Sequence, residues 1–542
     1  MTEAQESFTA FAAAAVDDML ERQPTMATSL GDHRFDDRLD DLRPEAIEEE
    51  ARVLSERLRE LDEFDVAALP VACQVDAQVL SVRLRERLFE LTESREHTWN
   101  PLVANPGTAL YLLLARDFAP LRERLANVAK RLAQVPEQLA AARVVLGHAA
   151  MPRVHVETAI DPFTGTLGLI EREIPRQLQA ASGVTGEVEQ ALAVGRQAVA
   201  DHIGWLREQL DGAAGNPRLG KDLFARKLAL VLDLDRSPEQ VLADALADID
   251  RVEAEIAAVA ATLGGSPSEV LARLAVDAPT DETVVAIARD ALAETREFVE
   301  QHDIITLYDD PVEIIVMPEI HRGVAVAYCD SPGPLDPPDA TTFFAISPTP
   351  ESWSAERVAS FYREYNVHAM RNLVIHEAMP GHVVQLSHSR RAPATTKVRQ
   401  AFWSGPFVEG WAVFAEAEMV RRGFGGPQVQ MHQLKMRLRT AINAVLDVRV
   451  HCDDLSQDDA MALMTGRGYQ EEGEAAGKWR RALLTSTQLS TYHVGVTQVT
   501  EVAARLRSAQ PSWSDRQVND ALLAHGNPPP RHLPALLGLT PG

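Results

Sequence analysis

Residues 376 to 382 read His-Glu-Ala-Met-Pro-Gly-His, and Glu409 follows in the segment Phe-Val-Glu-Gly-Trp-Ala. Imidazole nitrogens and carboxylate oxygens are ligands of catalytic zinc, which takes three protein ligands and keeps one position for water. A carboxylate beside such a site can accept the proton of that water as a general base. The residue types therefore predict a hydrolytic zinc centre with His376, His382 and Glu409 as ligands and Glu377 as the base. Manganese or cobalt would fit the same ligands.

The spacing of the two histidines differs from that of the usual zinc helix, in which the histidines stand four residues apart. On an ideal helix a spacing of six places them about 120° and roughly 9 Å apart, so a regular helix would not direct both at one ion. Pro380 lacks the N–H that a helix needs, and Gly381 permits unusual backbone angles. We expect the helix to break there, which would return His382 to the side of His376. The alternative is a helix end followed by a new cap, without a metal.

Glu409 lies in residues 406–422, which the sequence predicts to be one buried helix because the segment is apolar on nearly all sides. Glu416 follows two helical turns later and points the same way. Buried carboxylates are costly unless they are paired or bound to a metal. We therefore expect Glu409 to reach the ion and Glu416 to hydrogen-bond a ligand histidine. The alternative is that both carboxylates pair with arginines elsewhere.

The elements that must position these residues are mostly helices. Apolar residues recur at three- and four-residue steps in long segments upstream of the motif, namely 44–63, 70–94, 106–146, 186–212, 236–263 and 281–303. Capping boxes that begin at Ser237, Ser266 and Ser514 mark helix starts.

The pattern changes between about residues 305 and 350. Three short runs there, 313–317, 324–328 and 342–346, are rich in β-branched and aromatic residues and predict one small sheet. Helices resume after it. The chain is thus expected to divide into an N-terminal helical half, residues 1–304, and a catalytic half, residues 305–542.

Composition and charge limit the class of protein. The chain has 542 residues, 46% of them hydrophobic, which suffices for one large core or two packed halves. Its net charge of −26 argues against binding to nucleic acid or anionic lipid. Three widely separated cysteines argue against a disulfide framework. No basic and apolar leader and no apolar run of about 18 residues is recognisable, so we expect a cytoplasmic protein without a membrane partner.

Several segments resemble a large bacterial family long labelled a domain of unknown function, whose members carry His-Glu-x-x-Pro-Gly-His and are regarded as zinc peptidases. The resemblance rests on Tyr365-Asn366, on residues 373–382 with Gln385, on 409–412 and on the opening segment 24–31. The family's fold is similar to that of the thermostable metallocarboxypeptidases. The resemblance therefore implies a mainly α, two-lobed helical body with a deep central cleft and a small β-sheet next to the zinc helix.

The resemblance also implies a role for a late segment of the chain. Residues 488–495 match a Gln-x-x-x-Tyr-x-x-Gly stretch, where such enzymes use a Tyr or His to stabilise the oxyanion. Tyr492, with His493, is therefore the candidate, and a core tyrosine is the alternative. The chain departs from the family pattern at Val383, where a second histidine is common, and at Ser486-Thr487, where Pro-Gly is common.

Substrate-binding residues are expected on both sides of the motif. Zinc peptidases of this kind pair an edge strand with the extended substrate, and the strand at 342–346, with Phe344 and Ala345, is the candidate. A carboxypeptidase also needs a cation for the terminal carboxylate, which Arg480 or Arg481 would supply.

These patterns predict a zinc-dependent hydrolase that cleaves peptide bonds of short peptides, with carboxypeptidase action left open. Two alternatives remain at this stage. One is a zinc amidase or esterase that acts on a non-peptide small molecule. The other is a helical peptide-binding protein without catalytic metal.

Overall fold

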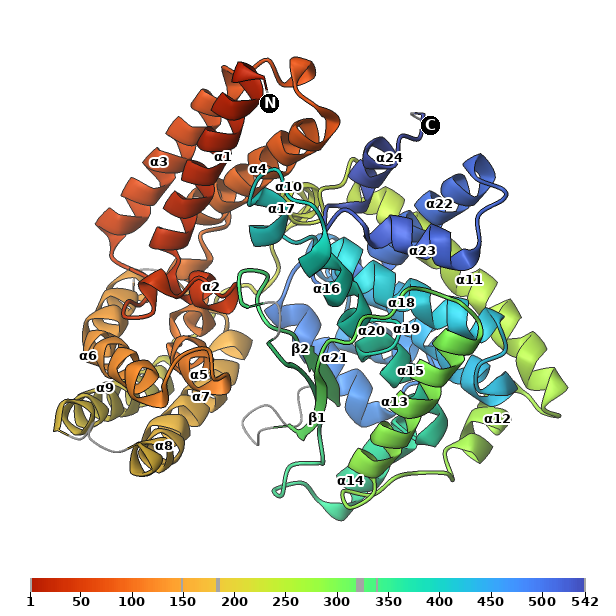
Figure 1. Cartoon of the computed structure of the whole chain (residues 1–542). Coiled ribbons are helices and arrows are strands. Elements are labelled where there is room, and N and C mark those ends of the chain that lie inside the picture. Colours follow the sequence, from red (N-terminus) through yellow and green to blue (C-terminus); the bar gives the residue numbers. More distant parts are fainter. Residues whose placement is uncertain (1, 148–149, 182–185, 318–325, 338–339, 541–542) are drawn as a thin grey trace. The chain divides into compact units, whose positions relative to one another are not determined.

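The computed structural model describes residues 2–147, 150–181, 186–317, 326–337 and 340–540 (Figure 1). Helices make up most of these residues, and three short strands form one small sheet. The mainly α fold with a small sheet is therefore confirmed.

Contacts divide the chain into two compact units. The first contains residues 1–217 together with 333–336 and 396–401, and the second contains 218–332, 337–395 and 402–542. The division thus differs from the predicted one at residue 304. The reason is that the helices after residue 217 pack against C-terminal helices, for example α11 (Pro238–Thr262) along α19 (Gly426–Cys452). The expected cleft stays a prediction.

The first unit is built of helices that bury one apolar core. They are α1 (Glu3–Arg22), α2 (Pro24–Ser29), α3 (Pro44–Asp62), α4 (Val71–Phe89), α5 (Gly107–Ala115), α6 (Leu121–Leu146), α7 (Arg153–Gly168), α8 (Ile174–Ala180), α9 (Gly186–Gln209) and α17 (Val398–Ala401). The segment predicted as one helix at 106–146 forms both α5 and α6. Pro120 caps α6 and separates the two helices, because proline cannot continue the hydrogen-bond ladder.

A buried ion pair joins a distant segment to the first unit. Asp76 of α4 is 1% exposed, and its Oδ1 accepts a hydrogen bond from Nε of Arg399 at 2.6 Å. Its Oδ2 accepts one from the Thr396 hydroxyl at 2.8 Å. Burial raises the pKa of Asp76, and the Arg399 guanidinium and the Thr396 hydroxyl act against that rise. Residues 396–401 thus neutralise a charge inside the first unit.

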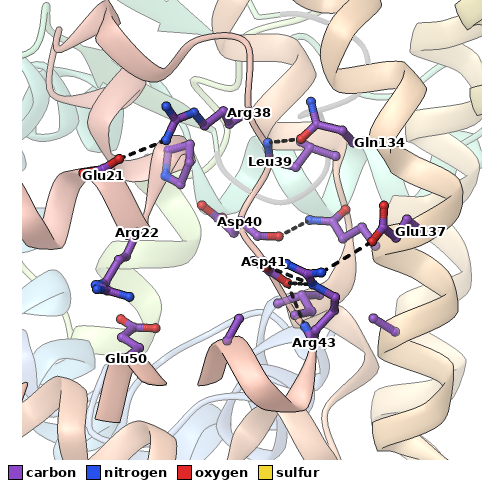
Figure 2. A pocket seen from close by; sticks show the side chains of 15 residues that line it. Glu21, Arg22, Arg38, Leu39, Asp40, Asp41, Arg43, Glu50, Gln134 and Glu137 are labelled. Carbon is purple, nitrogen blue, oxygen red and sulfur yellow. Dashed lines mark hydrogen bonds and ion pairs between the residues drawn. The ribbon is translucent and has the colours of Figure 1, made fainter. Parts of the chain in front are cut away.

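A cavity of about 370 Å³ lies in the first unit between α3, α6 and the segment that follows α2 (Figure 2). Its charged side chains pair with one another, because Arg38 reaches Glu21 at 3.2 Å and Arg43 reaches Asp41 at 2.6 Å. The Gln134 side chain accepts a hydrogen bond from the amide of Leu39. Five carboxylates and three arginines line the cavity, so its charge is negative on balance. Among the described residues, no group of candidate metal ligands lies there.

The second unit holds the sheet and the remaining helices. They are α10 (Lys221–Val231), α11, α12 (Pro267–Leu274), α13 (Val284–Gln301), β1 (Val312–Val316), β2 (Ala327–Asp330), β3 (Thr342–Ile346), α14 (Ala355–Glu364), α15 (Val367–Glu377), α16 (His382–Arg391), α18 (Gly405–Arg421), α19, α20 (Gln457–Ala462), α21 (Glu472–Leu484), α22 (Thr491–Ala509), α23 (Asp515–Leu523) and α24 (Leu533–Leu536). The predicted capping boxes open α11, α12 and α23. Residues 324–325 of the second predicted strand lie outside the described residues.

The strand order in the sheet is β1-β3-β2. β3 pairs in parallel with β1 and antiparallel with β2, so hydrogen bonds occupy both of its sides. The expectation that residues 342–346 form an edge strand is therefore wrong. Phe344 and Ala345 are fully buried in the middle of the sheet. The edge strand that packs beside α15 is β2.

Candidate metal centre

The two histidines of the motif lie on two successive helices. α15 ends at Glu377, and α16 begins at His382. A Cβ atom at Gly381 would lie 1.9 Å from the carbonyl oxygen of His376, so the turn has room for glycine alone. Trp411 of α18 donates from Nε1 to the carbonyl of Pro380 at 2.9 Å and fixes the turn against that helix. The predicted break between the histidines is present.

The break brings His376, His382 and Glu409 together. Nε2 of His376 lies 3.4 Å from Oε2 of Glu409, and Nε2 of His382 lies 3.6 Å from the same oxygen. Their ligand atoms all fall within 4.8 Å of one another. Among the described residues no lysine or arginine lies within 4.0 Å of Glu409, so the alternative of an arginine pair does not hold for it.

The donor set fits a zinc ion. Zinc bonds of about 2.1 Å in a tetrahedron place neighbouring ligand atoms about 3.4 Å apart, close to the separations between these atoms. Oε2 of Glu409 and Nδ1 of His382 are buried and have no hydrogen-bond partner among the described residues. Two imidazoles and one carboxylate around one point, with an unsatisfied buried oxygen, suit a cation better than a core contact.

Glu416 orients the first of these histidines. Nδ1 of His376 donates to Oε1 of Glu416 at 2.7 Å, which leaves Nε2 free to face the ligand cluster. The predicted hydrogen bond is therefore present. Sequence reasoning missed Asn372, whose Nδ2 donates to the other oxygen of Glu416 at 2.7 Å. The available signal was a polar residue one helical turn before His376, inside an otherwise apolar stripe.

The carboxylate of Glu377 lies beside the cluster. Oε2 of Glu377 accepts a hydrogen bond from the amide of Cys329 in β2 at 3.1 Å. Burial raises the pKa of this carboxyl, and the negative charge of Glu409 raises it further, while His376 and His382 lower it. A carboxylate with a raised pKa, held next to candidate metal ligands, is suited to accept and donate protons.

The electrostatics of the cluster favour a positive charge at its centre. Burial lowers the pKa of His376, but contacts with Glu409 and Glu416 outweigh burial and hold it well above the usual value. Burial raises the pKa of Glu409, yet the contacts with His376 and His382 outweigh it and hold the pKa below the usual range. The carboxylates of Glu409 and Glu416 thus favour positive charge at this point, which either a protonated imidazole or a metal ion can supply.

Tyr492, at the start of α22, lies within electrostatic reach of the cluster. Burial raises the pKa of its phenol, the charge of Glu409 raises it further, and Arg481 and His376 lower it. The position follows from an unusually close contact between α18 and α22. A Cβ atom at Gly495 would lie 2.1 Å from the carbonyl oxygen of Pro406, and one at Gly410 would lie 2.3 Å from the carbonyl carbon of Gly495.

The structure does not bring the other predicted residues to the cluster in the same way. His493 is buried, and its Nδ1 lies 3.6 Å from Oδ2 of Asp248 in α11. Arg480 is exposed on α21, whereas Arg481 contacts Tyr492. Of the two arginines only Arg481 is thereby linked to the candidate site.

The fold and this cluster define a mainly helical protein with a His-His-Glu site. The family model described as "Bacterial protein of unknown function (DUF885)" matches residues 24–537, and the chain belongs to that family. No curated protein is significantly similar to the chain.

Two solved structures share the fold over almost the whole length. A putative lipoprotein of unknown function from Shewanella oneidensis is 26% identical with a TM-score of 0.82, covering 98% of this chain and 99% of that chain. The putative lipoprotein from Colwellia psychrerythraea is 15% identical with a TM-score of 0.84, covering 99% of each chain. An M32 carboxypeptidase from Deinococcus radiodurans R1 aligns over 91% of this chain and 96% of its own, at 12% identity and a TM-score of 0.38, which is too low to establish a shared fold or activity.

These neighbours correct the predicted location. Both proteins with the shared fold are described as putative lipoproteins, a description that fits membrane-anchored or secreted proteins and contradicts the expected cytoplasmic location. No helix in the described part of the chain combines the length and the hydropathy that crossing a membrane requires.

Proposed function

We propose that the chain is a zinc-dependent hydrolase that cleaves peptide bonds of short peptides. The observation that carries this proposal is the convergence of His376, His382 and Glu409 on one point with the buried carboxylate of Glu377 beside it. Zinc held by these three residues would polarise the scissile carbonyl and lower the pKa of water.

The residues around the ion divide the remaining work. Glu377 accepts the proton of the attacking water and passes it to the leaving amine. Its hydrogen bond from the Cys329 amide fixes one carboxylate oxygen and leaves the other for the water. Tyr492 donates its phenol proton toward the oxygen on which negative charge develops.

The position of β2 at one edge of the sheet supports a peptide as the substrate. β2 is an edge strand, and its Cys329 amide points at the general base. An extended peptide added along this edge would gain main-chain hydrogen bonds and place its scissile bond near Glu377. In this proposal β2, and not the strand at residues 342–346 that the sequence suggested, is the edge strand that pairs with the substrate.

A Glu377→Gln variant tests the proposal, because it removes the base and keeps the three ligands. We expect one zinc per chain in both proteins and a loss of peptide hydrolysis of about 100- to 10,000-fold in the variant. Metal content is measured by elemental analysis, and hydrolysis by release of free amines from a mixed dipeptide and tripeptide set. Glu297→Gln, an exposed carboxylate on α13, is the matched control.

Removing the metal provides the second half of the test. A chelator should abolish hydrolysis by the wild-type chain, and stoichiometric zinc should restore it. Full activity of Glu377→Gln, or of chelator-treated protein, would overturn the proposal. Hydrolysis of simple esters and amides without any peptide cleavage would reassign the same centre to a small-molecule hydrolase.

A further inference from the structure

A group of basic residues lies on α19 and α21, and one of them, Arg481, contacts Tyr492. It consists of Lys435 and Arg439 of α19 and of Lys478 and Arg481 of α21. Lys478 and Arg481 stand three residues apart and therefore share one face of α21. Since α19 and α21 pack against each other, the four side chains belong to one region of the second unit.

Two of these basic residues have carboxylate partners. Nζ of Lys435 lies 2.9 Å from Oε2 of Glu364, and Arg439 forms a close ion pair with Glu474. Arg439 also donates to the Tyr365 hydroxyl at 3.2 Å. The two acidic residues are thus occupied by the two cations of α19.

Lys478 and Arg481 have no carboxylate in direct contact among the described residues. The Lys478 residue is only 6% exposed, and no carboxylate of the described residues lies within 4.0 Å of its amine or of the Arg481 guanidinium. A buried ammonium without a partner is costly. Burial, together with the charges of Arg439 and Arg481, accordingly holds the pKa of Lys478 well below its usual value. Glu474 and Glu364 act on Lys478 only at longer range, so an anion in direct contact would favour its charged form.

We infer that Lys478 and Arg481 bind the free carboxylate terminus of a peptide whose scissile bond lies at the His376–His382–Glu409 centre. Arg481 contacts Tyr492, and Tyr492 is within electrostatic reach of Glu409. The two basic residues therefore lie next to the candidate catalytic residues. The guanidinium and the ammonium together match the two oxygens of a carboxylate. The inference rests on the proposed function and makes the enzyme a carboxypeptidase.

The net charge of the chain strengthens the case for a dedicated site. A protein with a net charge of −26 repels anions in general, so a carboxylate needs a local positive region to be bound. Lys478 and Arg481 supply such a region within the second unit. A peptide whose C-terminus is blocked as an amide offers no charge to them.

The test compares three forms of one tripeptide: free C-terminus, C-terminal amide, and amide with a glutamate side chain. We expect the wild-type chain to cleave the free form with a kcat/KM at least about 10- to 100-fold above that of either amide, as expected for a charge-assisted hydrogen bond. Lys478→Met should lose this preference and raise KM for the free form, with kcat changed less. Lys221→Met, which removes an exposed lysine from α10, should keep it.

Binding of the same peptides to the zinc-loaded Glu377→Gln protein is measured by calorimetry and separates this inference from the proposed function. Tighter binding of the free form supports the carboxylate site even when no peptide is hydrolysed. Equal binding and equal cleavage of the free and amidated forms would overturn the inference and leave a peptidase of another specificity. Preference for the glutamate-bearing amide would also overturn it, because the cations would then select a side chain. The wild-type comparison needs no variant, so a poorly folded Lys478→Met protein does not affect it.

Discussion

Glu416 shows how a residue that does not touch the proposed ion can govern the site. It accepts hydrogen bonds from both His376 and Asn372 and is 2% exposed. The bond to Nδ1 fixes the ring so that Nε2 presents a lone pair to the cluster. The orientation of one imidazole is thus determined by a carboxylate two helical turns from Glu409.

A Glu416→Gln variant should therefore bind zinc about 10- to 100-fold more weakly, because an amide is a poorer acceptor for the imidazole N–H. Competition with a calibrated chelator measures the affinity. Glu297→Gln on the surface of α13 serves as the control and should bind zinc like the wild type. An unchanged affinity in Glu416→Gln would show that the histidine is positioned by other contacts.

Local chemistry made the convergence of His376, His382 and Glu409 largely predictable from the sequence. Pro380 and Gly381 dictate the break between the histidines wherever the segment packs, and an apolar helix forces Glu409 inward. The neighbouring residue His493 was harder to place. Successive residues of a helix point about 100° apart, so Tyr492 and His493 cannot face the same centre, and only the packing of α22 decides which one does.

Two glycines allow the helices α18 and α22 to pack closely against each other. Gly410 follows Glu409 directly, and Gly495 lies one helical turn after Tyr492. Their lack of side chains lets the two backbones come close enough for the tyrosine to approach the ligand cluster. The close contact between α18 and α22 therefore also sets the position of Tyr492 relative to the ligand cluster.

A Gly495→Ala variant should separate these helices, since its methyl group would meet the backbone carbonyl of Pro406 rather than a movable side chain. We expect a loss of stability of about 1–3 kcal/mol from overpacking and a fall in kcat of up to about 100-fold as Tyr492 moves away. Thermal unfolding and peptide hydrolysis measure the two effects. Gly473→Ala on α21, where a methyl group meets nothing within 4 Å, is the control. Wild-type kcat in Gly495→Ala would remove Tyr492 from the proposed mechanism.

The order of the strands could not be predicted from local sequence. Each run of β-branched residues identifies a strand, but its neighbours depend on pairings across more than ten residues of chain. β3 follows β2 in the sequence and yet inserts between β2 and β1. The sequence therefore predicted the existence of the sheet and not its edge.

The stability of the whole chain should depend on pH through a histidine far from the metal centre. His202 of α9 is fully buried beside Phe163 and Trp205, and its Nδ1 accepts a hydrogen bond from Nε of Arg143. Burial, with the charge of Arg143, lowers its pKa from 6.5 to about 3. The unfolded chain binds a proton here at a higher pH than the folded chain does. The stability that the neutral His202 side chain contributes is therefore complete above pH 6.5, and it is lost as the pH falls toward 3.

At pH 5 this group alone should lower the free energy of unfolding by about 2 kcal/mol relative to pH 7. Urea unfolding followed by tryptophan fluorescence measures the difference. His202→Gln, which keeps an acceptor for Arg143, should reduce the drop, and the exposed His302→Gln should not. An identical drop in the His202→Gln protein would assign the acid sensitivity to other groups.

The short segment that carries Arg399 has a practical consequence for anyone who divides this protein. A fragment cut after residue 217 would retain Asp76 but lose its guanidinium and hydroxyl partners. Without these partners, the buried carboxylate of Asp76 would have to be protonated or hydrated inside the protein. The amino-terminal piece should therefore be unstable when expressed by itself, and supplying residues 396–401 as a tethered peptide should rescue it.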